Sequence, residues 1–386
     1  ARPNREVNLI PNTVRNLTFN TWFNRPIAGL SCPLVYLAFN NEFNNKIDGL
    51  LPPTLNHLIF GIEFNHTVDQ LPPALTYLKF GNDFNKPVDS LPSGLVCLQF
   101  GMSFNQRVDN LPSTLTYLSF GDDFNQHVDR LPLSLKHLQF GDSFDKSVDH
   151  LPHSLINLGF GRNFNNHVDN LPPGLVCLHF GESFNQLVDH LPSTTTRLMF
   201  GCEFNQRVDA LPRSLKYLSF GNRFNKTVDH LPSSLRCLHV GFDFDTPVDM
   251  LPAQLHTLIL GNSFNQRVDN LPLALTHLIF GNDFNQRVDA LPQSLIRLKF
   301  GKKFNKSVYG LRTLTALQRL TFGHDFWQST ECCLPPSITH LQFGAFFNRD
   351  IDRLPTSLKY LTLGKDFNRS VTKLPDSIIQ LIFGEQ

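Results

Sequence analysis

Residues 71–90 read LPPALTYLKFGNDFNKPVDS, and almost the whole chain consists of copies of this stretch. Thirteen such copies of 20 residues follow one another over residues 51–310. A fixed period near 20 residues is at the short end of the periods found in solenoid proteins, whose units pack only against their neighbours. The sequence therefore predicts a solenoid and argues against a conventional globular enzyme.

Less regular units flank this block, and we expect them to extend the same solenoid. We interpret all 386 residues as one solenoid domain. Its parts, in chain order, are an N-terminal cap segment (1–9), two looser repeats (10–50), thirteen regular repeats (51–310), an irregular repeat (311–333), and two repeats followed by a terminal half-repeat (334–386).

The phenylalanines show which positions form the core. The chain contains 36 Phe, and 34 of them fall in two columns of the repeat, so that only Phe242 and Phe346 lie outside these columns. A hydrophobic fraction of 41% and a net charge of +1 argue against a disordered chain. No apolar run approaches the roughly 18 residues that a membrane span needs.

The first half of each unit has the pattern L-x-x-L-x-F-G, as in Leu75, Leu78, Phe80 and Gly81. A spacing of two residues between Leu78 and Phe80 predicts a β-strand with both side chains on one face, and the residues between them face the other way. Asn is found in place of the Gly in the first two units, and Asn tolerates a positive φ better than most residues. We therefore predict a left-handed backbone conformation at the end of each strand.

The second half of each unit returns the chain to the next strand. Val88 and Leu91 supply further core side chains, and Pro92 favours an extended return without a helix. Asp89 suits a turn, and a cation-binding carboxylate ladder is the less favoured interpretation. We predict one long parallel sheet with weak curvature, because the strand side and the return side of a helix-free coil have similar widths.

An Asn follows the second Phe in most units, and Asp replaces it at Asp145 and Asp245. We predict that this column is a buried ladder, in which each side chain satisfies backbone groups of its own and the next coil. Four sequons of this column, at Asn65, Asn225, Asn305 and Asn368, would then lie in buried positions, which favours a compartment without glycosylation. In the regular repeats the ladder consists of Asn65, Asn85, Asn105, Asn125, Asn165, Asn185, Asn205, Asn225, Asn265, Asn285 and Asn305.

The string F-G-x-x-F-N-x-x-V-D-x-L-P, as in residues 100–112, resembles the FNIP repeat. This is a divergent leucine-rich repeat family of amoeboid protists and large DNA viruses. The resemblance implies a viral or protist protein that acts as a protein-interaction module. Some viral members carry an F-box before the repeats, and an F-box of this chain would lie upstream of Ala1.

Functional residues are expected on the exposed strand face, where the repeat varies. Tyr, His and Arg are common at binding surfaces. The leading hypothesis is a non-enzymatic scaffold for a protein partner, and the alternatives are the substrate-recognition part of a ubiquitin-ligase adaptor or a carbohydrate-active β-helix. The candidate binding residues are Tyr77, Tyr117, His137, Arg197, Tyr217, His277 and Arg297.

Three places interrupt the regular pattern. A basic patch comprises Lys299, Lys302, Lys303 and Lys306, and it adjoins the irregular repeat that contains Trp327. Either feature is a docking site or a remnant of repeat duplication. The terminal half-repeat exposes Ile379 and Ile382 on an open strand, which predicts either end-to-end self-association or a missing cap.

Enzymatic, metal and cofactor sites find little support in the sequence. The His and Ser positions follow the repeat and form no catalytic arrangement. Cys177/His179 and Cys237/His239 lie too far apart to share a zinc ion, so we expect no metal and no cofactor. A net charge of +1 gives no reason to expect nucleic acid or membrane partners. Seven cysteines without a disulfide spacing favour a reducing, cytoplasmic or nuclear location.

Overall fold

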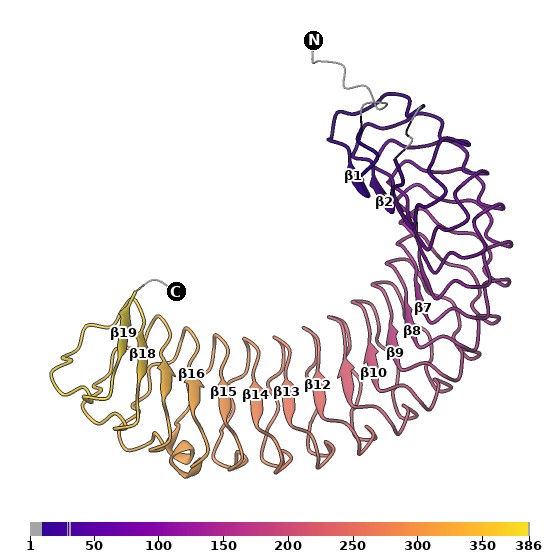
Figure 1. Ribbon diagram of the computed structural model, residues 1–386. Helices are drawn as coiled ribbons and strands as arrows, with labels where there is room; N and C mark the ends of the chain where they lie inside the picture. The colour runs from indigo at the N-terminus through magenta and orange to yellow at the C-terminus, as the bar shows by residue number, and fades with distance from the viewer. Residues whose placement is uncertain (1–9, 29, 31, 385–386) are drawn as a thin grey trace. The chain divides into compact units, whose positions relative to one another are not determined.

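The computed structural model describes residues 10–28, 30 and 32–384. The chain divides into two compact units, residues 1–186 and 187–386, and each unit is described by itself. In Figure 1 each coil of a unit contributes one short strand, and the return segments are almost free of helix. The N-terminal cap segment expected at residues 1–9 lies outside the described residues.

The described residues of the first unit form nine strands of three residues each. Every strand pairs in parallel with the next one along the chain. The strands are β1 (Asn16–Thr18), β2 (Tyr36–Ala38), β3 (His57–Ile59), β4 (Tyr77–Lys79), β5 (Cys97–Gln99), β6 (Tyr117–Ser119), β7 (His137–Gln139), β8 (Asn157–Gly159) and β9 (Cys177–His179).

The second unit contains ten strands that pair in the same way. One 3-10 helix, η2 (Tyr309–Thr313), lies in its irregular repeat. The strands are β10 (Arg197–Met199), β11 (Tyr217–Ser219), β12 (Cys237–His239), β13 (Thr257–Ile259), β14 (His277–Ile279), β15 (Arg297–Lys299), β16 (Arg319–Thr321), β17 (His340–Gln342), β18 (Tyr360–Leu363) and β19 (Gln380–Phe383).

The register of the strands follows the repeat. Leu78 pairs with Leu98 one repeat later, so equivalent residues of successive coils lie next to each other. The expected solenoid of parallel strands, with 20-residue repeats and returns largely without helix, is confirmed. The interpretation of residues 1–386 as a single domain and the weak curvature stay predictions.

Two stacks of Phe rings form the centre of each unit. Phe80 and Phe84 of one coil stack with ring centroids 3.7 Å apart, and Phe84 stacks on Phe104 of the next coil at 6.0 Å. Phe84 and Leu78 have no exposed surface. Burying an aromatic side chain of this size is among the largest single contributions to stability, and offset stacking adds to it. The assignment of both Phe columns to the core is therefore confirmed.

The glycine that ends each strand does not have the backbone conformation that we predicted. Among the described residues, a positive φ occurs only at Gly49 (67°) and Cys332 (56°), neither of which belongs to this column. A Cβ atom built on Gly121 would instead lie 1.9 Å from the carbonyl oxygen of Gly101 in the preceding coil. In most units from Gly61 onward glycine suits this position because the backbones of neighbouring coils meet here, and a left-handed turn is not the reason.

A second polar column was missed in the sequence. Many units have Ser or Thr directly before the first core Leu, and its hydroxyl donates a hydrogen bond to a carbonyl oxygen of the preceding coil. Ser154 Oγ donates to the carbonyl of Leu135 at 2.7 Å, and Ser234 Oγ does the same to Leu215 at 2.7 Å. The recurrence of Ser and Thr at this position was the available signal, but the partner carbonyl lies about one repeat away.

The Asn column joins each coil to the next. Asn105 Oδ1 accepts a hydrogen bond from the backbone N–H of Asn125 at 3.0 Å, and Asn125 Oδ1 accepts from the N–H of Asp145 at 3.1 Å. Asp145 continues the series to Asn165 at 3.0 Å, because a carboxylate oxygen serves equally well as the acceptor. Gln106 adds a bond from its Nε2 to Asn85 Oδ1 at 2.9 Å.

The ladder is less buried than we predicted. Asn65, Asn125 and Asn305 are half-buried, whereas Asn165 and Asn225 are exposed. Water reaches these amides because the column lies at the surface of the coil, next to the buried Phe column. The argument that burial would protect the ladder sequons from glycosylation is therefore wrong.

Gly121→Ala tests the close approach of neighbouring coils. The new methyl group would meet the Gly101 carbonyl, and no side-chain movement relieves a clash with backbone. We expect the free energy of unfolding to fall by about 2–3 kcal/mol, as overpacking does elsewhere. Urea denaturation followed by circular dichroism measures the loss.

Gly94→Ala is the matched control for this substitution. A Cβ at Gly94 lies 3.6 Å from its nearest neighbour, the Pro73 carbonyl oxygen, and its φ is not positive. Ala should be neutral here or stabilise the chain by about 0.4–1 kcal/mol. Equal losses in the two variants would contradict the steric explanation.

Asn125→Ala tests the ladder, because it removes the acceptor for the Asp145 N–H. We expect a loss of about 0.5–1.5 kcal/mol in the same urea experiment. Asn125→Asp keeps an acceptor oxygen, as Asp145 and Asp245 do naturally, and should cost less than half as much. If Asp proved as harmful as Ala, the acceptor oxygen would not be the group that the column supplies.

Candidate binding surface

Each repeat presents three outward positions, and we call their three columns the strand face. They are the residue directly before each strand and the outward residues on either side of the strand's buried Leu. In β6, for example, Tyr117 and Ser119 are half-buried on either side of the fully buried Leu118. The strand face is therefore built from a short strand whose alternate side chains point outward.

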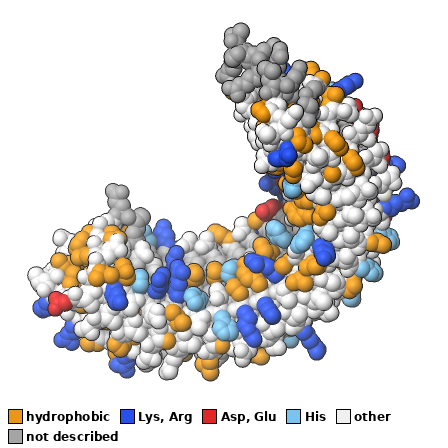
Figure 2. Space-filling model, viewed as in Figure 1, with side chains coloured by type: hydrophobic (Ala, Val, Ile, Leu, Met, Phe, Trp, Pro, Cys, Tyr) orange, Lys and Arg blue, Asp and Glu red, His pale blue; other side chains and the backbone are white. Residues whose placement is uncertain are grey.

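The strand face carries no Asp or Glu in any of the nineteen repeats. Because the whole chain has a net charge of +1, all other positions together carry a net charge of −9. Lys, Arg and His side chains are plainly visible in Figure 2, whereas Asp and Glu are sparse in this view. The face carries ten exposed Lys and Arg residues: Arg15, Lys79, Lys136, Arg197, Lys216, Arg236, Arg297, Lys299, Arg319 and Lys359.

None of these ten cations forms an ion pair with another residue in the described part of the chain. The contrast with the loops is clear, since Arg223 Nη1 lies 2.5 Å from Glu203 Oε2 and Lys303 Nζ lies 2.7 Å from Asp283 Oδ1. Charge on the strand face is therefore not compensated by the chain itself, whereas charge on the loops often is.

The structure places all seven candidate binding residues in one column of the strand face, as the first residues of their strands. Tyr77, Tyr117 and His137 begin β4, β6 and β7 of the first unit. The second unit holds the other four, which begin β10, β11, β14 and β15: Arg197, Tyr217, His277 and Arg297.

Neighbouring side chains of this column are in contact in the first unit. The rings of His57 and Tyr77 stack with centroids 5.5 Å apart, and those of Tyr117 and His137 lie 6.1 Å apart. Asn157 Nδ2 is 2.7 Å from His137 Nδ1. Such contacts restrict the motion of these rings, and side chains that are already ordered lose less entropy in any interface.

Similar contacts occur in the second unit. Arg197 Cζ lies 4.6 Å from the centre of the Tyr217 ring, a cation–π contact. The Tyr217 hydroxyl is 3.3 Å from His239 Nδ1, and the rings of His340 and Tyr360 stack at 4.3 Å. The surface therefore offers planar, partly ordered side chains together with free positive charge.

Cys237 and His239 are also close, with Sγ and Nε2 3.3 Å apart. Burial raises the pKa of the Cys237 thiol and lowers the pKa of the His239 imidazole, so the neutral forms of both are favoured. A reactive thiolate would need the opposite shifts. The described residues also contain no group of three or more His, Cys, Asp or Glu side chains that could hold a metal ion.

The structure divides the predicted basic patch. Lys299 is the third residue of β15 on the strand face, and Arg297 of the same strand pairs in register with Arg319 of β16. Lys302, Lys303 and Lys306 lie in the loop after the strand, where Lys303 pairs with Asp283. Arg319, the first residue of β16, therefore extends the part of the patch that lies on the strand face.

The irregular repeat is packed into the array. The backbone N–H of Trp327 still donates to Asn305 Oδ1 at 3.2 Å, but its indole offers no acceptor to the next coil. Arg349 from that coil covers the Trp327 ring at 4.7 Å and donates from Nε to its carbonyl oxygen at 2.8 Å. Arg349 therefore bridges the one step where the ladder acceptor is missing.

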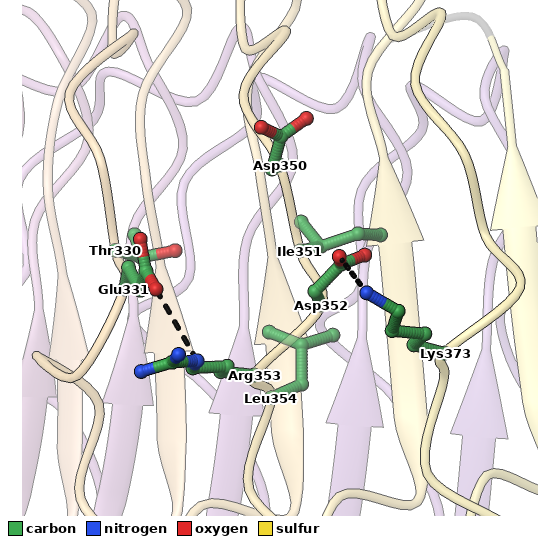
Figure 3. A pocket seen from close by; sticks show the side chains of 8 residues that line it. All are labelled: Thr330, Glu331, Asp350, Ile351, Asp352, Arg353, Leu354 and Lys373. Atoms are coloured by element: carbon green, nitrogen blue, oxygen red, sulfur yellow. Dashed lines mark hydrogen bonds and ion pairs between the residues drawn. The ribbon is translucent and has the colours of Figure 1, made fainter.

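A shallow depression in the same region does not form a binding site. Figure 3 shows that four of its five charged side chains form two ion pairs, and Asp350 is drawn apart from them: Arg353 Nε lies 3.2 Å from Glu331 Oε1, and Lys373 Nζ lies 2.8 Å from Asp352 Oδ2. Paired charges leave little unsatisfied potential for a ligand. The lining residues are Thr330, Glu331, Asp350, Ile351, Asp352, Arg353, Leu354 and Lys373.

A repeat of one short parallel strand with the pattern L-x-x-L-x-F defines a leucine-rich-repeat-like solenoid. The FNIP repeat model matches more than half of this chain, and the chain belongs to the FNIP repeat family. The matched residues are 64–103, 84–123, 104–143, 124–163, 204–243, 242–283, 264–303, 326–366 and 347–386.

Solved structures agree with this assignment. CroV588, a circular leucine-rich repeat protein from a giant virus, is 36% identical and has a TM-score of 0.75, covering 98% of this chain and 70% of that one. YopM from Yersinia enterocolitica is 21% identical with a TM-score of 0.59, covering 97% of this chain and 79% of that chain. The latter similarity shows the fold alone.

The Drosophila Toll–Spätzle complex is a more distant match, which again shows the fold alone. Its matched chain is 13% identical with a TM-score of 0.61, covering 91% of this chain and 57% of that chain. A comparison with curated protein sequences found no match. No helix in the described residues combines the length and the apolar character that a membrane span requires.

Acid should destabilise this surface. Burial lowers the pKa of His179, His239 and His340 below the ordinary value of 6.5, so protonation is harder in the folded chain than in the unfolded chain. Their contribution to stability is complete above pH 6.5 and is lost as the pH falls. We expect the melting temperature to drop between pH 7.5 and 5.5, measured by differential scanning calorimetry.

His239→Gln should reduce this dependence on pH. The exposed His153 lies outside the strand face, and His153→Gln serves as the control that leaves the dependence unchanged. If both variants kept the full drop in melting temperature, burial of His239 would not contribute to it.

Proposed function

We propose that this chain is a non-enzymatic scaffold that binds a protein partner through the strand face. The observation that supports this proposal is the strand face itself, which offers three outward columns of variable side chains, mostly exposed or half-buried, above a regular core. Tyr, Arg and His are frequent at protein interfaces, and they dominate the column formed by the first residue of each strand. Contacts such as Tyr117–His137 and Arg197–Tyr217 order these anchors in advance.

The leading alternatives gain less support. Carbohydrate-cleaving enzymes generally use a pair of carboxylates beside the scissile bond, and the strand face has none. No observed contact favours the substrate-recognition part of a ubiquitin-ligase adaptor over any other scaffold. A surface without carboxylates but with ordered rings is best suited to recognition.

The proposal is tested by capturing partners from a protist lysate with the purified chain. The variant Tyr117→Ser/Tyr217→Ser/His277→Ser removes three anchors from the strand face. We expect the specifically captured protein to be lost, and its affinity, once it is purified, to fall at least tenfold in isothermal titration calorimetry. That loss corresponds to about 1.4 kcal/mol of binding free energy.

The control places three substitutions on exposed apolar residues elsewhere. Leu133, Met250 and Leu273 are 83%, 67% and 83% exposed and lie outside the strand face. The variant Leu133→Ser/Met250→Ser/Leu273→Ser should keep the partner. Retention of the partner by the strand-face variant, or its loss only from the control variant, would contradict the proposal.

A further inference from the structure

We infer that the strand face of the second unit recognises an acidic segment of its protein partner, in which acidic residues flank apolar ones. This inference rests on the proposed function and adds the chemical class of the partner. Its basis is the separation of charge between the strand face and the rest of the chain, together with the order of side chains along strands β10–β16.

The second unit holds seven of the ten strand-face cations, and six of them form two groups of three. Arg197, Lys216 and Arg236 lie on or directly before β10, β11 and β12. The second group consists of Arg297 and Lys299 on β15 and Arg319 on β16, and Lys359 follows before β18. All seven side chains are exposed, and none is paired with a carboxylate of the described residues.

Such an arrangement is unfavourable for the chain alone. Arg297 and Arg319 are direct neighbours in register, and Lys299 projects from the same face two residues further along β15. Like charges opposite each other in a sheet are destabilising. The loops show that carboxylates are available, since Lys303 pairs with Asp283, but the strand face contains none. A partner that supplies carboxylates removes this repulsion.

In the third column of the strand face an apolar strip lies between the two basic groups, beside the His and Thr side chains that precede and begin β13 and β14. Ile259 of β13 and Ile279 of β14 are neighbours in register and are half-buried, and Ile296 lies directly before β15. Four strand steps of about 4.8 Å place β15 roughly 19 Å from β11. An extended chain covers that distance in about six residues. A segment with acidic residues at both ends and apolar residues between them therefore matches the surface.

A protein segment fits these residues better than nucleic acid does. A nucleic acid carries a charge at every nucleotide and would pass over the uncharged strip of Ile259 and Ile279. The net charge of −9 outside the strand face would also repel a long polyanion. An acidic–apolar peptide places its charges only where Arg and Lys lie.

The test uses a displayed library of random twelve-residue peptides, selected on the purified full chain at 50 mM salt. We expect Asp and Glu to be enriched at least threefold, at positions that flank apolar residues. Raising the salt to 500 mM should weaken the best peptide at least tenfold in fluorescence anisotropy, because exposed charges are screened.

The variant Arg297→Gln/Lys299→Gln/Arg319→Gln should bind the best peptide at least tenfold more weakly. The control Lys302→Gln/Lys303→Gln/Lys306→Gln removes as much charge from the adjoining loop and should keep the affinity. Circular dichroism confirms that both variants are folded. No enrichment of acidic residues, or equal losses in the two variants, would overturn the inference.

A twelve-nucleotide oligouridylate in the same anisotropy assay separates the two kinds of polyanion. Binding of this RNA more tightly than the best peptide would overturn the inference in favour of nucleic acid. The inference and the proposed function fail in different ways. Suppose that the captured partner binds through the strand face, but that its affinity changes neither with salt nor with the Arg297/Lys299/Arg319 substitutions. In that case only the inferred preference for acidic segments is wrong, and the proposed function stands.

Discussion

Each coil must follow the path of the preceding one at the spacing of neighbouring strands, about 4.8 Å. The closest approach is at the end of the strand, where the Gly121 backbone meets the Gly101 carbonyl with no room for a Cβ atom. The Phe84–Phe104 stacking and the hydrogen bond from Asn125 to Asn105 both need neighbouring coils in this same register. A side chain at the glycine position would force the coils apart and weaken both.

Much of this fold could be predicted because the same pattern of core residues recurs in unit after unit. The Leu and Phe spacing indicated the strand and its buried face, and Pro92 with its equivalents indicated a return without helix. The reason for the glycines could not be found in this way, since a positive φ is a local property whereas the clash comes from a residue 20 positions away. The Ser154–Leu135 bond was missed for the same reason.

The candidate surface was predictable in outline only. The repeat pattern places Tyr77 and Arg297 outward, but the sequence does not show which charges are paired. Lys303 and Lys299 look alike in the sequence, whereas in the structure the first pairs with Asp283 and the second has no such partner. The separation between the basic strand face and the acidic remainder of the chain becomes visible only when the structure shows which residues lie on the strand face.

The Asn ladder has a direction, because every acceptor lies one coil before its donor. Each regular step forms the same ladder hydrogen bond with the coil before it, and the strand-face residues are not part of this ladder. A gene that gains or loses one 20-residue unit therefore keeps the Phe stacking and the ladder between the coils that meet at the new junction, and changes the length of the strand face by one step of about 4.8 Å. The set of side chains on the strand face can therefore change by duplication and deletion, in whole units, as well as by point mutation.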